Sequence, residues 1–334
     1  MEETKETGRM IVSRLIALLS VVSASFVQAA TPLPTITPQS IPARTGDDLK
    51  ASEKIPALCD SLKEAFGKYK WDLEKPCEGF NIQAERVSLE KRPLIYAEFG
   101  NPESTNRTLV LSMVHPDEIT PLYLAFKIME WTKQNQKELS DYYVVIAPFI
   151  NPDGFYRKPP IRMNARGVDL NRNFATADWP ARALKSWKGA LHSNPRRFPG
   201  HEPNSEPETH FQRELIERVK PVKILSIHAP LNVMDYDGPS SLTLDRFPKE
   251  YVNECVKLRN RLKARSTGFF PGSLGNYSGQ ERGIPTITLE LPTANPAKAA
   301  DYWKKFQQGI RSMIEHKIDS AAQRDDKFPP VSMR

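Results

Sequence analysis

Four short apolar runs, each rich in Val, Ile or Leu, recur along the chain and are separated by longer amphipathic segments. Strands that read as continuous apolar runs are covered on both faces, which is typical of parallel strands packed between helices. The pattern therefore predicts an α/β fold, a three-layer α/β/α sandwich around a mostly parallel or mixed central sheet. The predicted strands are residues 108–114, 142–148, 222–227 and 286–291, and the predicted helices end near residue 136 or cover 206–219, 248–263 and 296–316.

A shorter pattern precedes these runs. Residues 47–70 have helical periodicity, and residues 86–89 and 94–99 alternate like the two strands of a hairpin. We therefore predict a small N-terminal module at 47–92, a larger domain at 93–318 and a flexible tail at 319–334. The module's residues leave three roles open: a removable pro-segment, a docking element or an extension of the sheet.

The first 46 residues predict export. Arg14 precedes an apolar stretch at 15–26, and small residues follow up to Ala29, as in a secretory signal peptide at 1–29. The stretch is shorter than an ordinary membrane-spanning helix, so we expect no stable membrane insertion after cleavage. An uncleaved anchor is the alternative, and Met10 is an alternative start. The proline-rich residues 30–46 fit a linker.

Charge and cysteine content narrow the function classes. The net charge is +7, but the basic residues at 196–197 and 257–265 fit solvated surfaces, so we predict no nucleic-acid binding. The three cysteines lack the two-residue spacing of thiolate metal sites. Export allows a disulfide between Cys59 and Cys77, with buried free thiols as the alternative, and Cys255 fits a core position.

Polar side chains stand at the ends of three predicted strands. His115 and Glu118 follow the first strand, His228 follows the third, and Glu290 lies near the end of the fourth. These side chains can meet, because the carboxyl ends of strands form the ligand crevice of an open α/β sheet. Two imidazoles and a carboxylate suit a catalytic zinc, and a further carboxylate can act as general base and acid. A surface pair, an ordinary hydrogen-bonded histidine and an ion-paired glutamate are the alternatives.

The segment 162–174 is dense in guanidinium and amide donors. Arginine binds a carboxylate through two parallel hydrogen bonds, and a second arginine near a metal can stabilise an oxyanion. Arg162, Asn171 and Arg172 are therefore candidate anion-binding residues, with a solvated basic loop as the alternative.

Taken together, these motifs resemble the zinc metallocarboxypeptidase family. The resemblance implies one zinc ion per chain, bound by His115, Glu118 and His228, with Glu290 as general base and acid. It also implies that Arg162 stabilises the oxyanion and that Asn171 and Arg172 bind the substrate's free carboxylate. The matching segments are His115-Pro116-Asp117-Glu118, Asn151-Pro152-Asp153-Gly154, residues 167–174, Ser226-Ile227-His228 and Thr288-Leu289-Glu290.

Within the family, residues 167–174, 205–209 and 271–275 are most similar to the murein peptide amidase branch. That branch cuts the amide between γ-D-glutamate and meso-diaminopimelate in peptidoglycan peptides, so the resemblance implies such a peptide as substrate. Asp235 and Asp237 are candidates to hold the far ammonium group of diaminopimelate, although Asp-Gly also makes simple turns.

The sequence also departs from the family. The tyrosine that digestive members carry has no clear counterpart, since Phe269 and Phe270 occupy that region and Tyr277 is too near Glu290. Residues 175–203 are an added stretch that we expect to form a loop beside the pocket.

Three functions follow as hypotheses. The first is an exported, periplasmic zinc amidase that cuts the γ-D-glutamyl-diaminopimelate bond. The second is a carboxypeptidase that removes a terminal D-alanine or an ordinary amino acid with the same zinc and carboxylate machinery. The third, a non-catalytic cell-wall-binding module, is disfavoured because every expected catalytic residue is present. The sequence assigns no oligomeric state.

Overall fold

The computed structural model describes residues 40–138, 141–239, 246–250 and 270–318. The predicted signal peptide, most of the linker, most of the predicted helix at 248–263, Cys255 and the tail at 319–334 lie outside the described residues. Within the described part, no helix is long and apolar enough to cross a membrane.

One seven-stranded sheet forms the centre of the fold, in the order β1-β2-β4-β3-β5-β7-β6. β4, β3, β5 and β7 are mutually parallel, whereas β1 pairs with β2, β2 with β4 and β6 with β7 in antiparallel fashion. The predicted mixed sheet is thereby confirmed. The strands are Ile82–Val87 (β1), Pro93–Gly100 (β2), Asn106–Ser112 (β3), Tyr142–Phe149 (β4), Lys223–His228 (β5), Met234–Asp237 (β6) and Thr286–Glu290 (β7).

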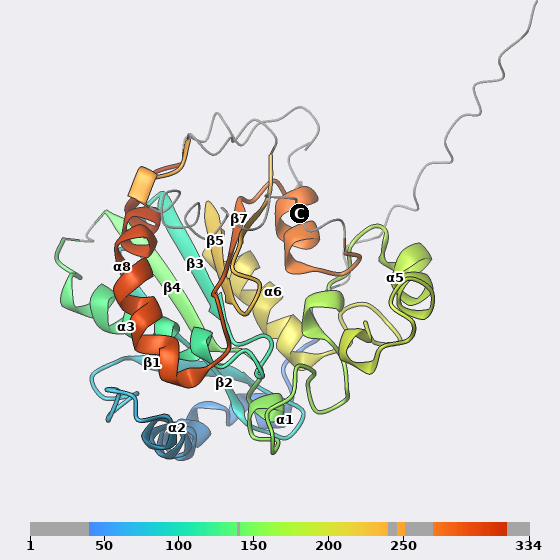
Figure 1. Cartoon of the computed structure of the whole chain (residues 1–334), viewed down its shortest axis with the longest axis horizontal. Helices are drawn as coiled ribbons and strands as arrows, with labels where there is room; N and C mark the ends of the chain where they lie inside the picture. Colours follow the sequence, from blue (N-terminus) through green and yellow to red (C-terminus); the bar gives the residue numbers. More distant parts are fainter. Residues whose placement is uncertain (1–39, 139–140, 240–245, 251–269, 319–334) are drawn as a thin grey trace, which may run out of the picture. The chain divides into compact units, whose positions relative to one another are not determined.

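Helices cover both faces of this sheet, as predicted. Figure 1 shows α3 and α8 side by side on one face, with α6 on the other. Two separate sets of buried apolar side chains result, one under α2, α3 and α8 and one under α6. The helices are Ile55–Tyr69 (α2), Thr120–Gln134 (α3), Pro207–Val219 (α6) and Ala299–Glu315 (α8), with short turns at Gly46–Leu49 (α1), Ser52–Lys54 (η1), Pro152–Phe155 (α4), Leu170–Arg172 (η2), Gly275–Gln280 (η5) and Pro296–Lys298 (η6).

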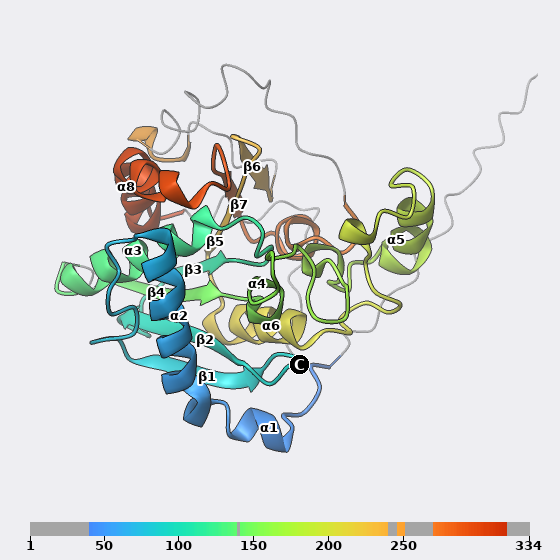
Figure 2. The same ribbon diagram turned by 60° about the horizontal axis from the view of Figure 1, so that its bottom comes forward.

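The residues of the predicted N-terminal module pack against the main sheet. β1 forms the outer strand of the sheet through its hairpin with β2, and α2 lies against both strands (Figure 2). Cys59 on α2 is disulfide-bonded to Cys77, which confirms the bridge over the alternative of free thiols. The domain boundary after residue 92 therefore falls at the turn of a hairpin, and the separate module stays a prediction.

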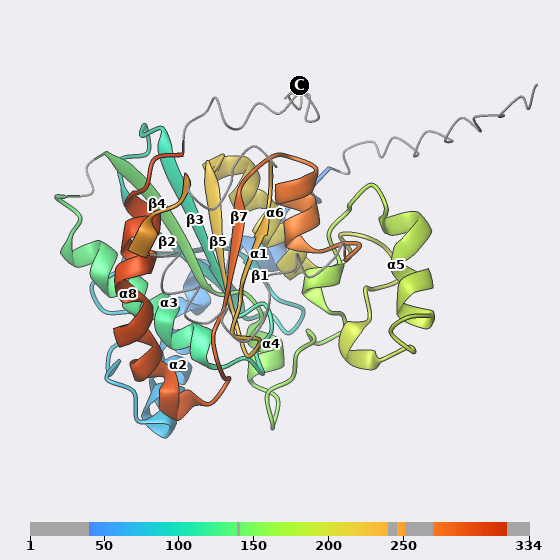
Figure 3. The same ribbon diagram turned by 45° about the horizontal axis from the view of Figure 1, so that its top comes forward.

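The added stretch at 175–203 is more ordered than the loop that the sequence predicts. It contains the helix Trp179–Lys188 (α5) and the short helix Pro195–Arg197 (η3). α5 has Pro180 in its first turn and buries Trp179 and Ala183. Figure 3 shows α5 away from the sheet, on the side opposite α8. The apolar pattern of the sequence does not predict this helix, because few of its residues are buried.

Lys223 is a fully buried cation at the start of β5. Its Nζ donates hydrogen bonds to Asn106 Oδ1 at 2.7 Å and to the carbonyl of His316 at 2.6 Å, just after α8. Burial lowers the pKa of Lys223 to about 7. The side chain therefore connects the end of α8 to the sheet through hydrogen bonds, whereas its burial disfavours the charged form of the amine.

This lowered pKa predicts a pH-dependent stability. Between about pH 7 and pH 10 the unfolded chain binds a proton at Lys223 that the folded chain releases, so this residue's contribution to stability rises with pH in that window. We expect the free energy of unfolding of the wild type, relative to Lys223→Met, to increase across the window. Urea unfolding of both proteins at several pH values measures it, and two parallel pH profiles would contradict the prediction.

Candidate metal and active site

His115 and Glu118 lie in the turn between β3 and α3. The backbone leaves the strand through Met113, whose φ of 60° reverses the chain direction, and the N–H of Glu118 then donates to the carbonyl of His115 at 3.0 Å. The turn brings the two side chains together, with His115 Nδ1 and Glu118 Oε1 2.9 Å apart.

His228, the last residue of β5, completes the predicted trio of ligands. Its Nδ1 lies 3.0 Å from Glu118 Oε2 and 3.2 Å from His115 Nδ1. All three side chains are buried, and their donor atoms lie within 4.8 Å of one another. Donors around one tetrahedral zinc would be about 3.3 Å apart, so this arrangement fits the metal.

The outer nitrogens of both imidazoles are already engaged. His115 Nε2 lies 2.9 Å from Asp169 Oδ1, and His228 Nε2 lies 3.1 Å from Ser226 Oγ. Such partners fix the ring orientation and direct the opposite nitrogen toward a metal. The donor chemistry and the orientation of both rings therefore fit zinc, the cofactor that the sequence implies. Asp169 and Ser226 lie within the quoted motifs, but nothing in their sequence context distinguishes them as partners of the two histidines.

Neighbouring charges keep Glu118 of the trio and the adjacent Asp169 ionised. Burial alone would raise the pKa of Glu118, but the two imidazoles hold it below the ordinary value. Likewise, Arg162 and His115 outweigh burial and keep the pKa of Asp169 well below its ordinary value. An ionised Glu118 is the form that binds a cation.

Arg162 is buried next to these carboxylates. Its Nε donates to Asp169 Oδ2 at 2.9 Å and its Nη1 to Glu118 Oε1 at 3.1 Å. Arg162 thus lies beside the metal-ligand candidates, and its role as oxyanion stabiliser stays what the resemblance implies. Asp169 contacts both Arg162 and His115.

Glu290 ends β7 directly beside His228, because the register of the parallel strands β5 and β7 pairs these two residues. Burial raises the pKa of Glu290; His228 opposes this shift and Glu118 adds to it. The backbone N–H of Leu231 lies 3.4 Å from its Oε2. A carboxylate with a raised pKa next to a metal site is suited to taking and returning a proton.

Asn171 and Arg172 lie on η2 and line a cavity that also contains the metal-ligand candidates and Glu290. Arg172 is buried, its guanidinium stacks 4.2 Å from the centre of the Phe270 ring, and burial lowers its pKa to about 10. Its Nε has no hydrogen-bond partner among the described residues. Asn171 Oδ1 accepts from the N–H of Leu274 at 2.8 Å, which orients the amide. A buried guanidinium with unused donors is suited to a carboxylate ligand.

Asp235 and Asp237 enter the cavity from β6, a short edge strand that the sequence did not predict. Burial, with the neighbouring charge of Asp235, raises the pKa of Asp237 to about 6. Gly275 allows this approach, because a Cβ atom there would lie 1.9 Å from Asp237 Oδ2. Asp237 is the last residue of β6, so both aspartates belong to the strand and any turn at Asp237-Gly238 starts after it.

A cavity of about 810 Å³ joins these groups. Every predicted site residue lies on its wall, and so do Arg196 and Arg197, which the sequence placed on a solvated surface. Tyr277 does not line it; it is buried against Phe174 and its hydroxyl accepts from Arg213 Nε. The lining includes His115, Glu118, Arg162, Asn171, Arg172, Arg196, Arg197, His228, Asp235, Asp237, Phe270 and Glu290.

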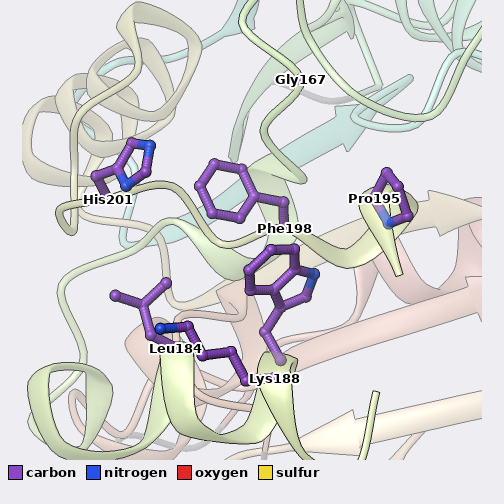
Figure 4. A pocket seen from close by; sticks show the side chains of 7 residues that line it. Gly167, Leu184, Lys188, Pro195, Phe198 and His201 are labelled. Atoms are coloured by element: carbon purple, nitrogen blue, oxygen red, sulfur yellow. The ribbon is translucent and has the colours of Figure 1, made fainter. Parts of the chain in front are cut away.

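A second cavity of about 370 Å³ is lined mainly by the added stretch, together with Gly167. Figure 4 shows Leu184 and Lys188 of α5 facing Phe198 and His201 across it. Its lining is mainly apolar and holds no cluster of metal-binding side chains in the described residues.

Comparisons with known proteins agree with this geometry. The sequence model of a family described as zinc carboxypeptidase matches residues 84–309. Murein peptide amidase A from Escherichia coli (strain K12) is 30% identical over 221 residues, which cover 64% of this chain and 82% of that protein. Murein peptide amidase A from Vibrio campbellii is 28% identical over 233 residues, which cover 68% and 84% of the two chains.

Solved structures show the same fold. The murein-tripeptide amidase from Escherichia coli O157 superposes with a TM-score of 0.50 at 25% identity, over 71% of this chain and 93% of that chain. Carboxypeptidase A from Helicoverpa armigera superposes with a TM-score of 0.52 at 17% identity, over 85% and 78% of the two chains. The second similarity concerns the fold alone.

Proposed function

Because the chain belongs to the zinc carboxypeptidase family, we propose that it is an exported, periplasmic enzyme that hydrolyses the amide bond between γ-D-glutamate and meso-diaminopimelate in peptidoglycan peptides. Membership of the family makes it a metallopeptidase-type enzyme. The finer substrate is supported by the murein peptides named in its relatives.

One observation supports this proposal most strongly. A single cavity contains the His115, Glu118 and His228 trio, the acid/base candidate Glu290 and the buried Arg172. Hydrolysis beside a free carboxylate needs these three functions within reach of one substrate. The complete set argues against the alternative of a non-catalytic wall-binding module.

The chain's own residues then have distinct tasks. Arg172 and Asn171 hold the free carboxylate of the leaving residue, which positions the scissile amide toward the trio. Zinc bound by the trio would supply a Lewis acid that polarises the carbonyl and lowers the pKa of water. Glu290 takes the proton of the attacking water and returns it to the departing amine nitrogen. Arg162 stabilises the negative charge that develops on the carbonyl oxygen.

The two aspartates of β6 are proposed to recognise diaminopimelate. Asp237 has a raised pKa because it is buried beside Asp235, and an ammonium group in the cavity would stabilise its charged form. Diaminopimelate carries such a group at its far end, whereas most amino acids do not.

This recognition predicts a substrate-dependent loss of activity. We expect Asp237→Asn to lower kcat/KM about 10- to 100-fold on a peptide that ends in diaminopimelate, because a charge-assisted hydrogen bond is lost. On a matched peptide that ends in 2-aminopimelate, which lacks only the far amino group, the change should be small. Asp235→Asn is measured in the same way. Equal losses on both peptides would contradict ammonium recognition.

The rival carboxypeptidase function is separated by product analysis. Purified protein is incubated with the tripeptide L-Ala-γ-D-Glu-meso-diaminopimelate and with the tetrapeptide that adds D-alanine, and the products are identified by mass spectrometry. The proposal expects free diaminopimelate from the tripeptide. Release of D-alanine alone would favour the rival function.

A further inference from the structure

Arg196 and Arg197 reach the catalytic cavity from the added stretch at 175–203. Both lie on η3 and line the cavity beside Arg162 and Glu118. Their position is a property of the inserted segment and does not follow from the residues shared with the family motifs.

The backbone that carries η3 is fixed on both sides. Trp187 of α5 packs on Phe198 with ring centres 4.8 Å apart, and its Nε1 donates to the carbonyl of Asn194 at 2.8 Å. The carbonyl of Phe198 in turn accepts from the N–H of Asp169 at 2.8 Å. Pro195 and Phe198, which flank the two arginines in sequence, both line the smaller cavity (Figure 4). The arginines are thus held by packed residues at either end of η3.

The two arginines differ in their partners. Arg196 Nη1 pairs with Asp117 Oδ2 at 2.6 Å and its side chain is 54% exposed. The half-buried side chain of Arg197 forms no hydrogen bond or ion pair with any residue that the structure describes. Arg162, by contrast, donates to two carboxylates. Arg197 therefore lines the cavity as a cation that has no carboxylate partner among the described residues.

The electrostatic surroundings of Arg197 are also unusual. Burial lowers the pKa of Arg197, and the positive charge of Arg162 lowers it further; Asp169 opposes this shift, Arg196 adds to it, and Glu118 opposes it least. A guanidinium group in such a position gains from an anionic ligand, which would offset both the lost hydration and the repulsion.

A γ-linked glutamyl residue offers such an anion. Its side-chain carboxyl group forms the scissile amide, so its α-carboxylate stays free a short carbon chain away from the reacting carbon. An ordinary α-linked peptide uses its α-carboxyl group in the scissile amide, so it has no free α-carboxylate on that side. The leaving diaminopimelate supplies a different carboxylate, which Asn171 and Arg172 are placed to bind.

We propose that Arg197 binds the free α-carboxylate of the γ-linked glutamyl residue and thereby selects γ-linked over α-linked peptides. This inference rests on the proposed function. It assigns to the inserted segment the recognition of the acyl side of the substrate, while Arg172 recognises the leaving side.

The test compares two tripeptides that differ in one group. One is L-Ala-γ-D-Glu-meso-diaminopimelate, and the other carries an α-carboxamide in place of the α-carboxylate. The wild type is expected to prefer the carboxylate form. Arg197→Ala should lower kcat/KM about 10- to 100-fold on that form and only slightly on the amide form, so that the preference disappears. Arg182→Ala, on the exposed face of α5, is the matched control and should keep the wild-type preference.

The outcomes separate this inference from the proposed function. Equal effects of Arg197→Ala on both tripeptides, or no effect on either, would overturn the role of Arg197 while the amidase function stands. A wild type that cleaves the tripeptides without preferring the carboxylate form would do the same. Failure of the wild type to cleave either tripeptide would overturn the proposed function and this inference together.

Discussion

Replacing Glu290 with Gln is expected to lower kcat on the tripeptide about 10²- to 10⁴-fold, because the amide keeps the shape of the side chain but cannot accept the proton of the attacking water. Glu290 lies beside His228 without being one of the three ligand candidates. The zinc content of the variant should therefore stay close to that of the wild type. Steady-state kinetics and elemental analysis of the same preparations measure both quantities.

A control separates this effect from a general loss of negative charge. Glu217→Gln makes the same chemical change on α6, where the side chain is 56% exposed and pairs only with Arg213 in the described residues. It should leave kcat near the wild-type value. Full activity of Glu290→Gln would show that another group moves the proton.

Replacing His228 with Ala is expected to remove both zinc and activity. His228 supplies one of three converging donors, and the remaining two cannot hold the metal with comparable affinity. Removing an outer partner of a ligand typically costs about 10- to 100-fold in metal affinity, so losing a ligand should cost more. Asp169→Asn alters the partner of His115 Nε2, so its zinc affinity should lie between that of His228→Ala and that of the wild type.

Metal titration monitored by elemental analysis tests this order, with far-ultraviolet circular dichroism to confirm that each variant is folded. Zinc added back should restore activity to a chelator-treated wild type but not to His228→Ala. A His228→Ala protein that retains one zinc ion at wild-type affinity would show that the metal is held elsewhere.

The apolar runs predict the sheet well because they are buried on both faces. β3, β4, β5 and β7 each lie within a few residues of the predicted range. Since parallel strands share their carboxyl edge, the ends of these strands also predict where the side chains of His115, His228 and Glu290 converge. The register of β5 and β7 then places the last two side by side.

Other parts of the site depend on contacts that local patterns do not contain. β6 alternates too briefly and is too polar to read as a strand, yet its pairing with β7 brings Asp235 and Asp237 into the cavity. The sequence around Asp169 indicates only a polar residue in a basic loop. Its contacts with His115 and Arg162 arise from the fold and are not visible in the local pattern.

The two arginines of η3 illustrate the same limit. In the sequence they form an ordinary basic pair in a polar stretch, and such pairs usually face solvent. Their place in the cavity depends on the packing of α5 against Phe198 and on the hydrogen bond from the N–H of Asp169 to the carbonyl of Phe198. Interactions between residues distant in sequence therefore decide the surroundings of the site, whereas the strand ends decide its centre. The predicted signal peptide and periplasmic location stay predictions.

The central claim is that two imidazoles and one carboxylate from distant parts of the chain hold one zinc ion facing Glu290. Anomalous diffraction collected on either side of the zinc absorption edge, from crystals of the purified protein, tests it most directly. The account predicts one peak per chain within bonding distance of His115 Nδ1, His228 Nδ1 and a Glu118 carboxylate oxygen, on the side that Glu290 faces. A peak bound by other residues, or no peak in crystals of zinc-supplemented active protein, would contradict it.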